Sequence, residues 1–286
     1  MTKYPYQLAM PAQRATSVVF SSPHSGCVYP RSFLHQTILD EHAVRSSEDA
    51  FVDQLFADAQ VFGAPLISAQ VPRAYVDLNR SHDELDPAVI SGVARMAHNP
   101  RVSSGLGVIP RVVANGRAIY RGKIPRHEAQ LRLSTYWFPY HDMLQTLLDD
   151  SLSAFGEAIL VDCHSMPHEA ISALDRTPGG RPEVILGDRF GASAHCEIVD
   201  QIAAAFKRAG FRVAHNAPFA GAYITQHYGR PSRGQHAIQI EIDRSLYMNE
   251  QMIRPNRNFD NFRRSLRGVI AEICRIGHRK IPMAAE

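Results

Sequence analysis

Short runs of apolar residues alternate along this chain with longer amphipathic stretches, and this alternation constrains the fold more than any other feature. Continuous apolar runs are typical of strands covered on both faces, and they occupy residues 17–21, 64–69, 74–78, 158–162, 184–187 and 237–242. Helical apolar stripes lie at residues 51–62, 140–152, 192–209 and 256–276. The pattern predicts an α/β fold, a three-layer sandwich around a largely parallel mixed sheet.

Length and composition fit one globular domain. The 286 residues are 45% hydrophobic and 21% charged, and the net charge of +3 is too small to indicate a nucleic-acid partner. No apolar stretch is long enough for a membrane span, and the N-terminus lacks the apolar core of a signal peptide. Four cysteines without CxxC spacing favour a reduced, cytoplasmic compartment. We expect a single domain over residues 1–286, no membrane partner, and long functional loops at 98–126 and 166–182.

Two histidines follow strands of the predicted sheet. His24 comes after the run that ends at residue 21, and His164 comes after the run that ends at Asp162. Ligands of such sheets bind outside the carboxyl ends of the strands, and neutral imidazole is the commonest zinc ligand. A pair of hydrogen-bonded histidines at loop starts is the alternative. Their joint presence, with an acidic segment available, favours a metal site.

The third ligand of a catalytic zinc is expected to be a carboxylate, and residues 46–49 offer two. Ser46 has the pattern of a helix N-cap with Asp49 three residues later, so Glu48 and Asp49 are predicted to lie in a first helical turn. Acidic residues there also stabilise the helix dipole, and one of the two can do only that. A helical wheel places Glu48 inside the apolar stripe and Asp49 at its edge, which slightly favours Glu48 as the inward group.

One carboxylate lies within the last apolar run. Glu241 alternates with isoleucines and shares a strand face with Gln239 and Asp243. A half-exposed strand with a polar face would give the same pattern. The functional interpretation is a partly desolvated carboxylate with a raised pKa, acting as general base to a metal-bound water.

Basic residues gather around residues 73–80 and in the loop that follows. Arg73 and Arg80 flank a short predicted strand, and Asn79 precedes Arg80. The neighbouring loop adds Arg111, Arg117, Arg121, Lys123 and Arg126. A guanidinium binds a carboxylate through a planar fork of donors, so the array predicts a pocket for an acidic small molecule. A solvated basic loop is the alternative, and we expect it to hold for most of the loop residues but not for Arg80.

Competing chemistries lack their motifs in this sequence. There is no GxSxG, no GxxxxGK[ST] and no HExxH. Cys163 precedes His164, but adjacent residues of a strand point to opposite faces, so the two make a poor catalytic dyad. We expect Cys163 to lie in the core.

Four segments of the chain occur in an order that is typical of one known family. They are residues 22–26 (SPHSG), 77–80 (DLNR), 162–165 (DCHS), and a run from 221–225 (GAYIT) through 229–231 (GRP) to 239–242 (QIEI). Together they resemble the N-formylglutamate amidohydrolases over roughly residues 16–275. The DLNR tetrapeptide is also similar to one in aspartoacylases and succinylglutamate desuccinylases, which belong with the zinc carboxypeptidases. The resemblance implies a zinc-dependent hydrolase on that carboxypeptidase-like fold.

The resemblance also implies which residues hold the metal and move protons. His24 and His164 would be zinc ligands, and the family's acidic ligand falls on Asp49. This disagrees with the helical wheel, and we follow the resemblance. Cys27 stands where the carboxypeptidase pattern has a glutamate ligand, so the acidic ligand has to come from further along the chain. Glu241 matches the catalytic glutamate.

The same resemblance predicts how substrate is bound. Asn79 and Arg80 match a pair that holds the substrate carboxylate. Arg73 matches an arginine that polarises the scissile carbonyl in the aspartoacylase-like enzymes. Tyr223, in the GAYIT segment, is expected to bind substrate, and Arg121 or another arginine of its loop is expected to bind a second, side-chain carboxylate.

We therefore predict an enzyme, a zinc-dependent amidohydrolase with one Zn²⁺ per chain. It would cleave N-formyl-L-glutamate to formate and L-glutamate, a reaction of histidine degradation, so its partner would be a small acidic N-acyl amino acid. A deacylase of another N-acyl amino acid, a carboxypeptidase-like enzyme and a non-catalytic protein that binds an acidic metabolite are the alternatives. The sequence leaves the oligomeric state open.

Overall fold

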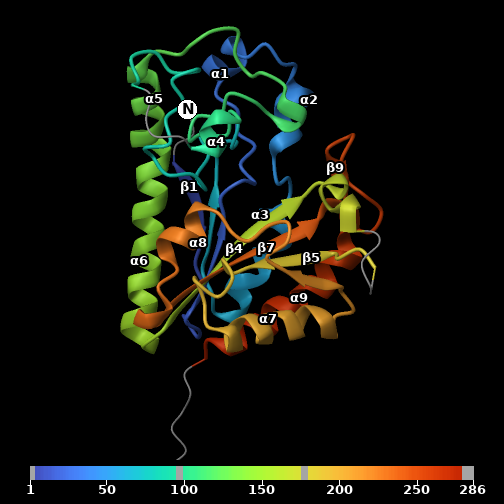
Figure 1. Cartoon of the computed structure of the whole chain (residues 1–286). Coiled ribbons are helices and arrows are strands. Elements are labelled where there is room, and N and C mark those ends of the chain that lie inside the picture. Colours follow the sequence, from blue (N-terminus) through green and yellow to red (C-terminus); the bar gives the residue numbers. More distant parts are fainter. Residues whose placement is uncertain (1–3, 95–98, 175–179, 279–286) are drawn as a thin grey trace, which may run out of the picture.

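A mixed sheet organises the protein. The computed structural model describes residues 4–94, 99–174 and 180–278, and within them it has one seven-stranded sheet of order β1-β3-β2-β4-β7-β5-β6 (Figure 1). β1 is antiparallel to β3 and β5 is antiparallel to β7, while the other neighbours are parallel, which confirms the predicted sheet. The strands are β1 (Tyr6–Ala9), β2 (Val18–Ser22), β3 (Leu66–Ala69), β4 (Ala158–Met166), β5 (Val184–Gly187), β6 (Val213–His215) and β7 (Gln235–Asp243). A separate ribbon joins β8 (Met248–Asn249) to β9 (Arg254–Pro255).

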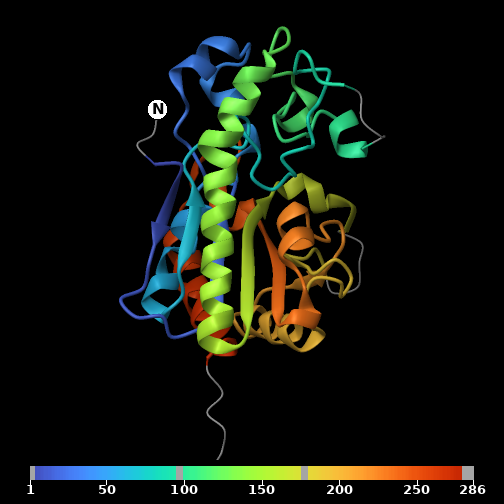
Figure 2. The same ribbon diagram turned by 90° about the vertical axis from the view of Figure 1, so that its left-hand side faces the viewer.

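Helices cover both faces of the sheet and complete the predicted three layers. One face packs against α3, α7 and α9, and the other packs against α6 and α8 (Figures 1 and 2). The helices of the described residues are α1 (Arg31–Gln36), α2 (Glu41–Val44), α3 (Val52–Leu55), α4 (Pro100–Ser103), α5 (Arg126–Arg132), α6 (Phe138–Phe155), α7 (Cys196–Arg208), α8 (Tyr223–Tyr228) and α9 (Phe259–Ile276).

The two central strands explain why the sequence reads as continuous apolar runs. Every residue of β4 and of β7 is buried, because each strand has a neighbour on both sides and helices on both faces. Along β4, Val161 and Cys163 face the α3, α7 and α9 layer, while Leu160 faces α6. Cys163 is fully buried there, as predicted.

The predicted strand at residues 74–78 is wrong. The chain turns there instead, and the amides of Tyr75 and Val76 both donate to the carbonyl of Pro72. Its apolar side chains are buried under α6 in the same core as Leu160, rather than in a sheet ladder. An apolar run predicts burial, and burial alone does not distinguish a strand from a packed turn.

The predicted helix start at Ser46 is also wrong. Residues 45–47 form a short 3-10 turn after α2, and Glu48 is extended. Phe51 follows in the left-handed region at φ +69°, so the next helix begins only at Val52. Ser46 donates its hydroxyl to the carbonyl of Ala43 instead of capping a helix. The acidic segment is therefore an extended link rather than a first helical turn.

The remaining predicted elements hold with shifted ends. The stripe at 51–62 divides into α3 and a 3-10 segment, and α6, α7 and α9 match the other predicted helices. The short, partly exposed strands β1 and β6 were not predicted. Of the predicted loops, residue 98 and residues 175–179 lie outside the described residues, and the rest is irregular chain with short helical turns. Among the helices that the structure describes, none combines the length and apolarity needed to cross a membrane.

Candidate metal centre and active-site cleft

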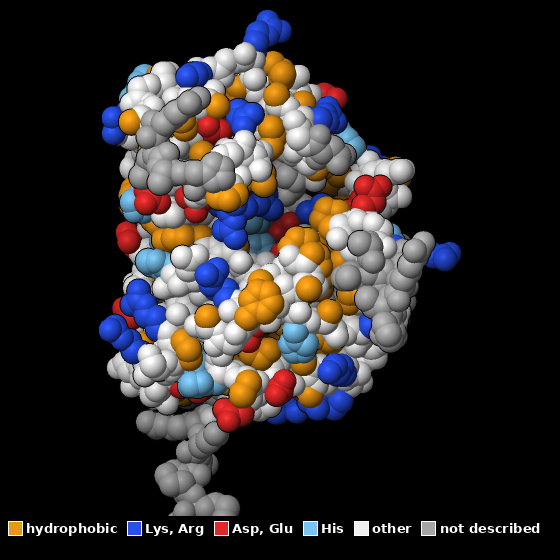
Figure 3. All heavy atoms as spheres, in the orientation of Figure 1, with side chains coloured by type: hydrophobic (Ala, Val, Ile, Leu, Met, Phe, Trp, Pro, Cys, Tyr) orange, Lys and Arg blue, Asp and Glu red, His pale blue; other side chains and the backbone are white. Residues whose placement is uncertain are grey.

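A cleft opens at the carboxyl ends of the central strands. It has a volume of about 660 Å³ and is lined by residues that follow β2 or belong to the carboxyl-terminal parts of β4 and β7, together with residues of segments 101–116 and 218–222. Figure 3 shows this face hollowed near its centre, where basic, acidic and histidine side chains meet. This is the position in which open α/β sheets bind their ligands.

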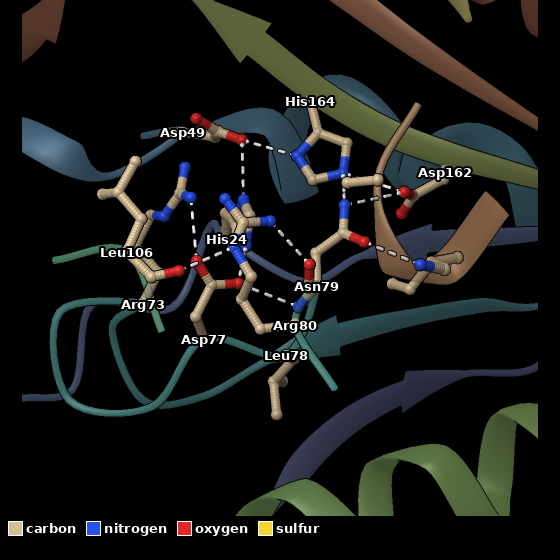
Figure 4. Close-up of polar contacts among 12 residues, drawn as sticks. His24, Asp49, Arg73, Asp77, Leu78, Asn79, Arg80, Leu106, Asp162 and His164 are labelled. Atoms are coloured by element: carbon tan, nitrogen blue, oxygen red, sulfur yellow. Dashed lines mark hydrogen bonds and ion pairs between the residues drawn. The ribbon is translucent and has the colours of Figure 1, made fainter. Parts of the chain in front are cut away.

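His24, Asp49 and His164 converge at the base of the cleft, and we call these three residues the metal group. All are buried, and their ligand atoms lie within 4.8 Å of one another. Asp49 Oδ2 is 2.9 Å from Nδ1 of His164 and 3.4 Å from Nδ1 of His24 (Figure 4). Two ring nitrogens therefore point at one carboxylate oxygen.

The metal group fits a bound cation better than a closed hydrogen-bond network. Nδ1 of His24 is buried and has no hydrogen-bond partner within the described residues. A buried polar atom without a partner is costly and calls for an explanation. Two imidazoles and one carboxylate are also the donor set of a catalytic zinc site that keeps a position open.

Two further carboxylates hold the histidine rings from behind. Asp77 Oδ1 lies 2.7 Å from Nε2 of His24, and Asp162 Oδ2 lies 2.9 Å from Nε2 of His164 (Figure 4). An ionised carboxylate only accepts hydrogen bonds, so each Nε2 carries a hydrogen, and each ring would present the lone pair of Nδ1 to a cation bound at the metal group. This arrangement behind a ligand histidine is typical of metal sites. Neither aspartate was predicted from the sequence to have a role.

Asp49, rather than Glu48, lies beside the two histidines. Glu48 accepts hydrogen bonds from Tyr29 and Arg45 and faces away from the histidines. Although burial disfavours its charge, the neighbouring His164 and His24 rings hold the pKa of Asp49 well below its usual range. The wheel argument failed because the segment is not a helix.

Arg244 fixes the other oxygen of Asp49, and the sequence analysis did not identify it. Its Nη2 lies 2.9 Å from Asp49 Oδ1, and its Nε donates to Ser165. The carboxylate therefore offers only Oδ2 to the metal group. Arg244 directly follows β7, the strand that carries Glu241. That position is the sequence signal that could have identified Arg244 as a site residue.

Glu241 lies beside the metal group. Parallel pairing of β4 and β7 puts it in register with His164, and it lines the cleft while only 8% exposed. Its Oε1 accepts a hydrogen bond of 2.8 Å from Gln239. Burial raises the pKa of Glu241 to about 7. A carboxyl group with such a pKa can both accept and deliver a proton near neutral pH.

The side chain of Asn79 holds neighbouring parts of the site together, whereas the guanidinium of Arg80 has one nitrogen left for a ligand. Asn79 donates from Nδ2 to Asp162 and accepts at Oδ1 from the amide of Ile224, so its side chain is committed to the protein. Arg80 donates from Nε to the carbonyl of Leu106 and from Nη1 to the carbonyl of Asn79. Its Nη2 makes no hydrogen bond among the described residues. Of the predicted pair, Arg80 is the better placed to receive a ligand.

Arg73 also lines the cleft, as the sequence analysis predicted. Its Nη2 lies 2.8 Å from Asp77 Oδ2, the carboxylate whose other oxygen holds His24. Burial opposes the guanidinium charge, but the charges of Asp77 and Asp49 raise the pKa of Arg73. A fixed cation therefore lies next to the metal group.

Two predicted substrate contacts do not reach the cleft. Arg121 is exposed. Its neighbour Tyr120 is buried against Arg132 and pairs with Thr37, and adjacent residues of an extended segment point in opposite directions. Tyr223 begins α8 and packs its ring against an aromatic cluster of Trp137, His141 and His227. Neither side chain lines the cleft.

Arg101 lines the cleft although the sequence analysis did not single it out. It belongs to α4, inside the loop that was predicted to carry the arginine pocket. Arg111 of the same loop is instead paired with Asp86 at 3.0 Å. Sequence position alone did not distinguish these arginines.

Comparison with known proteins gives a consistent result. The sequence model of the N-formylglutamate amidohydrolase family matches residues 16–248. The chain is 30% identical over 238 residues to an N-formylglutamate deformylase of Pseudomonas aeruginosa, covering 82% of this chain and 83% of that protein. A second N-formylglutamate deformylase, from Pseudomonas putida, is 29% identical over 236 residues, with 82% of each chain covered.

Solved structures agree with the sequence comparison. The crystal structure of N-formylglutamate amidohydrolase from Ralstonia eutropha JMP134 matches with a TM-score of 0.89 and 32% identity, over 96% of this chain and 98% of that one. The structure of gene product Atu2144 from Agrobacterium tumefaciens shares the fold, with a TM-score of 0.63 and 17% identity over 96% of this chain and 94% of its own. The family is one of enzymes that hydrolyse non-peptide amide bonds, as predicted. With a family match over most of its length, this chain belongs to the N-formylglutamate amidohydrolase family.

Proposed function

We propose that this protein is a zinc-dependent deformylase that hydrolyses N-formyl-L-glutamate to formate and L-glutamate. The observation that carries the proposal is the convergence of His24, Asp49 and His164 beside Glu241, at the base of a cleft that arginines line. The names of the relatives support the choice of substrate. We further propose that the chain acts as one hydrolase domain with one zinc ion.

The metal group would hold zinc through Nδ1 of both histidines and Oδ2 of Asp49. When bound, zinc would polarise the formyl carbonyl and increase the acidity of water. The chain's own contribution is to fix the ligands: Asp77 and Asp162 set the two rings, and Arg244 restricts Asp49 to one oxygen.

Glu241 would move the proton. Gln239 occupies Oε1, and Oε2 makes no hydrogen bond among the described residues, so Oε2 is the proton acceptor. It takes a proton from the attacking water as the new carbon–oxygen bond forms, and it delivers that proton to the nitrogen as the carbon–nitrogen bond breaks. Water and formylglutamate are thereby converted to formate and glutamate, with Glu241 returned to its starting state.

The arginines would orient the substrate. Arg80 offers its Nη2 edge to the carboxylate next to the reacting nitrogen. Arg73, held by Asp77, adds a fixed positive charge where the carbonyl oxygen gains negative charge. Arg80 is buried and Arg73 is partly buried, which strengthens these interactions.

A matched pair of neighbouring variants tests the metal assignment. Asp49→Asn removes a predicted ligand, whereas Glu48→Gln changes the adjacent carboxylate that faces Tyr29. We expect elemental analysis to find about one zinc per chain in the parent and in Glu48→Gln, and little in Asp49→Asn. Full zinc in Asp49→Asn, with zinc lost from Glu48→Gln, would reverse the assignment.

A substrate panel tests the reaction. Release of formate or acetate is measured for N-formylglutamate, N-formylglutamine, N-formylmethionine and N-acetylglutamate under one condition. We expect N-formylglutamate to be preferred. Faster turnover of a neutral side chain or of the acetyl compound would support a deacylase of another N-acyl amino acid. Binding of acidic metabolites without any turnover would support a non-catalytic protein.

A further inference from the structure

The cleft contains more positive charge than its own carboxylates neutralise. Two of its arginines are ion-paired, Arg73 with Asp77 at 2.8 Å and Arg244 with Asp49 at 2.9 Å. The other two have no carboxylate partner within the described residues. The four arginines that line the cleft in the described part of the chain are Arg73, Arg80, Arg101 and Arg244.

Arg80 and the backbone of Arg101 are both hydrogen-bonded to the main chain of Leu106. The carbonyl of Leu106 accepts from Arg80 Nε at 2.9 Å, and the amide of Leu106 donates to the carbonyl of Arg101 at 2.8 Å. The backbone amide of Arg101 is bound by Asn99, while its guanidinium makes no hydrogen bond or ion pair among the described residues. We call Arg80 and Arg101 the arginine pair.

The charges of the arginine pair repel each other. Burial lowers the pKa of Arg80, and the charges of Arg73 and Arg101 lower it further against the opposite effect of Asp77. The charge of Glu84 interacts with both members, but Glu84 forms no ion pair with either among the described residues and lines a neighbouring cavity. Anions bound in the cleft would relieve this repulsion.

We propose that Arg101 binds the side-chain carboxylate of the substrate and thereby makes the enzyme selective for N-formylated acidic amino acids. This rests on the proposed function for the identity of the reaction. Arg80 follows Asn79, whose amide lies against His164, so Arg80 is next to the metal group and suits the carboxylate nearest the reacting nitrogen. Arg101 lies on α4 beyond Leu106 and suits the carboxylate at the far end of the side chain.

Two arginines of one loop make a matched experiment. Arg101→Ala removes the proposed contact, and Arg121→Ala removes an exposed arginine outside the cleft. Values of kcat/KM are measured for N-formylglutamate and for N-formylglutamine, which differ only in the side-chain charge and one donor group. Zinc content is measured for each protein, and Arg101→Gln is included as a variant that keeps a polar side chain without the positive charge.

The expected result is a loss confined to one substrate. Arg101→Ala and Arg101→Gln should lower kcat/KM for N-formylglutamate roughly 10- to 100-fold, the usual effect of losing a charged hydrogen-bonded contact. The value for N-formylglutamine should change less than about threefold. Arg121→Ala should match the parent on both. Equal losses on both substrates, or no loss on either, would overturn the role of Arg101.

Product binding separates this inference from the proposed function. Calorimetry compares the affinity of the parent and of Arg101→Ala for L-glutamate and L-glutamine. If the parent releases no formate but prefers glutamate through Arg101, the proposed reaction fails, whereas the binding of a side-chain carboxylate by Arg101 is supported. If the parent hydrolyses N-formylglutamate but Arg101→Ala keeps the full preference for glutamate over glutamine, the inference fails alone.

Discussion

The metal group and the arginine pair share one cleft but are held in different ways. His24 and His164 belong to the ends of buried strands, and a buried carboxylate holds each ring. Arg101 comes from a four-residue helix within a long loop, and only its backbone is fixed. A sheet that is buried on both faces holds reacting groups rigidly, whereas loops tolerate change. The difference predicts that the chemistry and the choice of substrate can be altered separately.

The largest expected effect separates proton transfer from metal binding. Glu241→Gln keeps the size of the side chain and its contact with Gln239, but an amide does not accept the proton. We expect kcat to fall roughly 10²- to 10⁴-fold, the usual contribution of a general base, while zinc content and KM stay close to the parent values. A kcat within about threefold of the parent would mean that another group moves the proton.

The second largest effect on activity is expected in the arginine pair. Arg80→Ala removes a charged contact to a carboxylate in a buried site, which is worth roughly 2–5 kcal/mol. Formate release should show kcat/KM for N-formylglutamate reduced about 30-fold or more. Arg80→Lys should recover little, because an ammonium keeps the charge but not the planar group whose Nε and Nη1 are fixed by backbone carbonyls. Loss of zinc from Arg80→Lys would show that the two regions are not separable.

Glu241 should also reduce the stability of the protein when no metal is bound. Its pKa rises from 4.5 to about 7 on folding, so the folded state opposes its ionisation. The cost is absent below about pH 4.5, grows as the pH rises, and is complete above about pH 7. With EDTA present, Glu241→Gln should be more stable than the parent near pH 8, by up to about 3 kcal/mol, and little different near pH 5.

Urea unfolding at both pH values measures this difference. Arg101→Ala is the control, because a guanidinium does not titrate in this range and its variant should show no such pH dependence. Equal stability of Glu241→Gln and the parent near pH 8 would mean that the carboxyl group is solvated in the metal-free protein.

The smallest expected effect concerns the carboxylates behind the histidines. Asp77→Asn and Asp162→Asn keep the shape but remove the charge that fixes each ring. Competition with a chelator should show zinc affinity reduced roughly 10- to 100-fold in each variant. Arg101→Ala should bind zinc as the parent does. Unchanged affinity in both aspartate variants would mean that the rings are held by packing alone.

The same contrast explains how much of the fold could be predicted. Strands buried on both faces, such as β4 and β7, have continuous apolar sequences and are recognised directly. The partly exposed β1 and β6 have no such signal. Residues 74–78 have the apolar signal without being a strand, because they are buried in a turn under α6.

The residues of the candidate site also differ in how well the sequence predicts them. His24, His164 and Glu241 follow from strand ends, and the choice of Asp49 needed the resemblance because the local helix was wrongly predicted. Asp77 and Asp162 act only through contacts with side chains brought to them by the fold. Which loop arginine faces the cleft depends on how residues 99–126 fold, and the sequence has no periodicity there that reports it.

The central claim is that the metal group and Glu241 together hydrolyse N-formylglutamate. The most direct test strips the protein of metal with a chelator, removes the chelator, and measures formate release from N-formylglutamate as zinc is added back. We expect almost no release from the stripped protein and recovery of the parent rate at about one zinc per chain. A full rate in the stripped protein, or no formate after zinc is restored, would contradict the account.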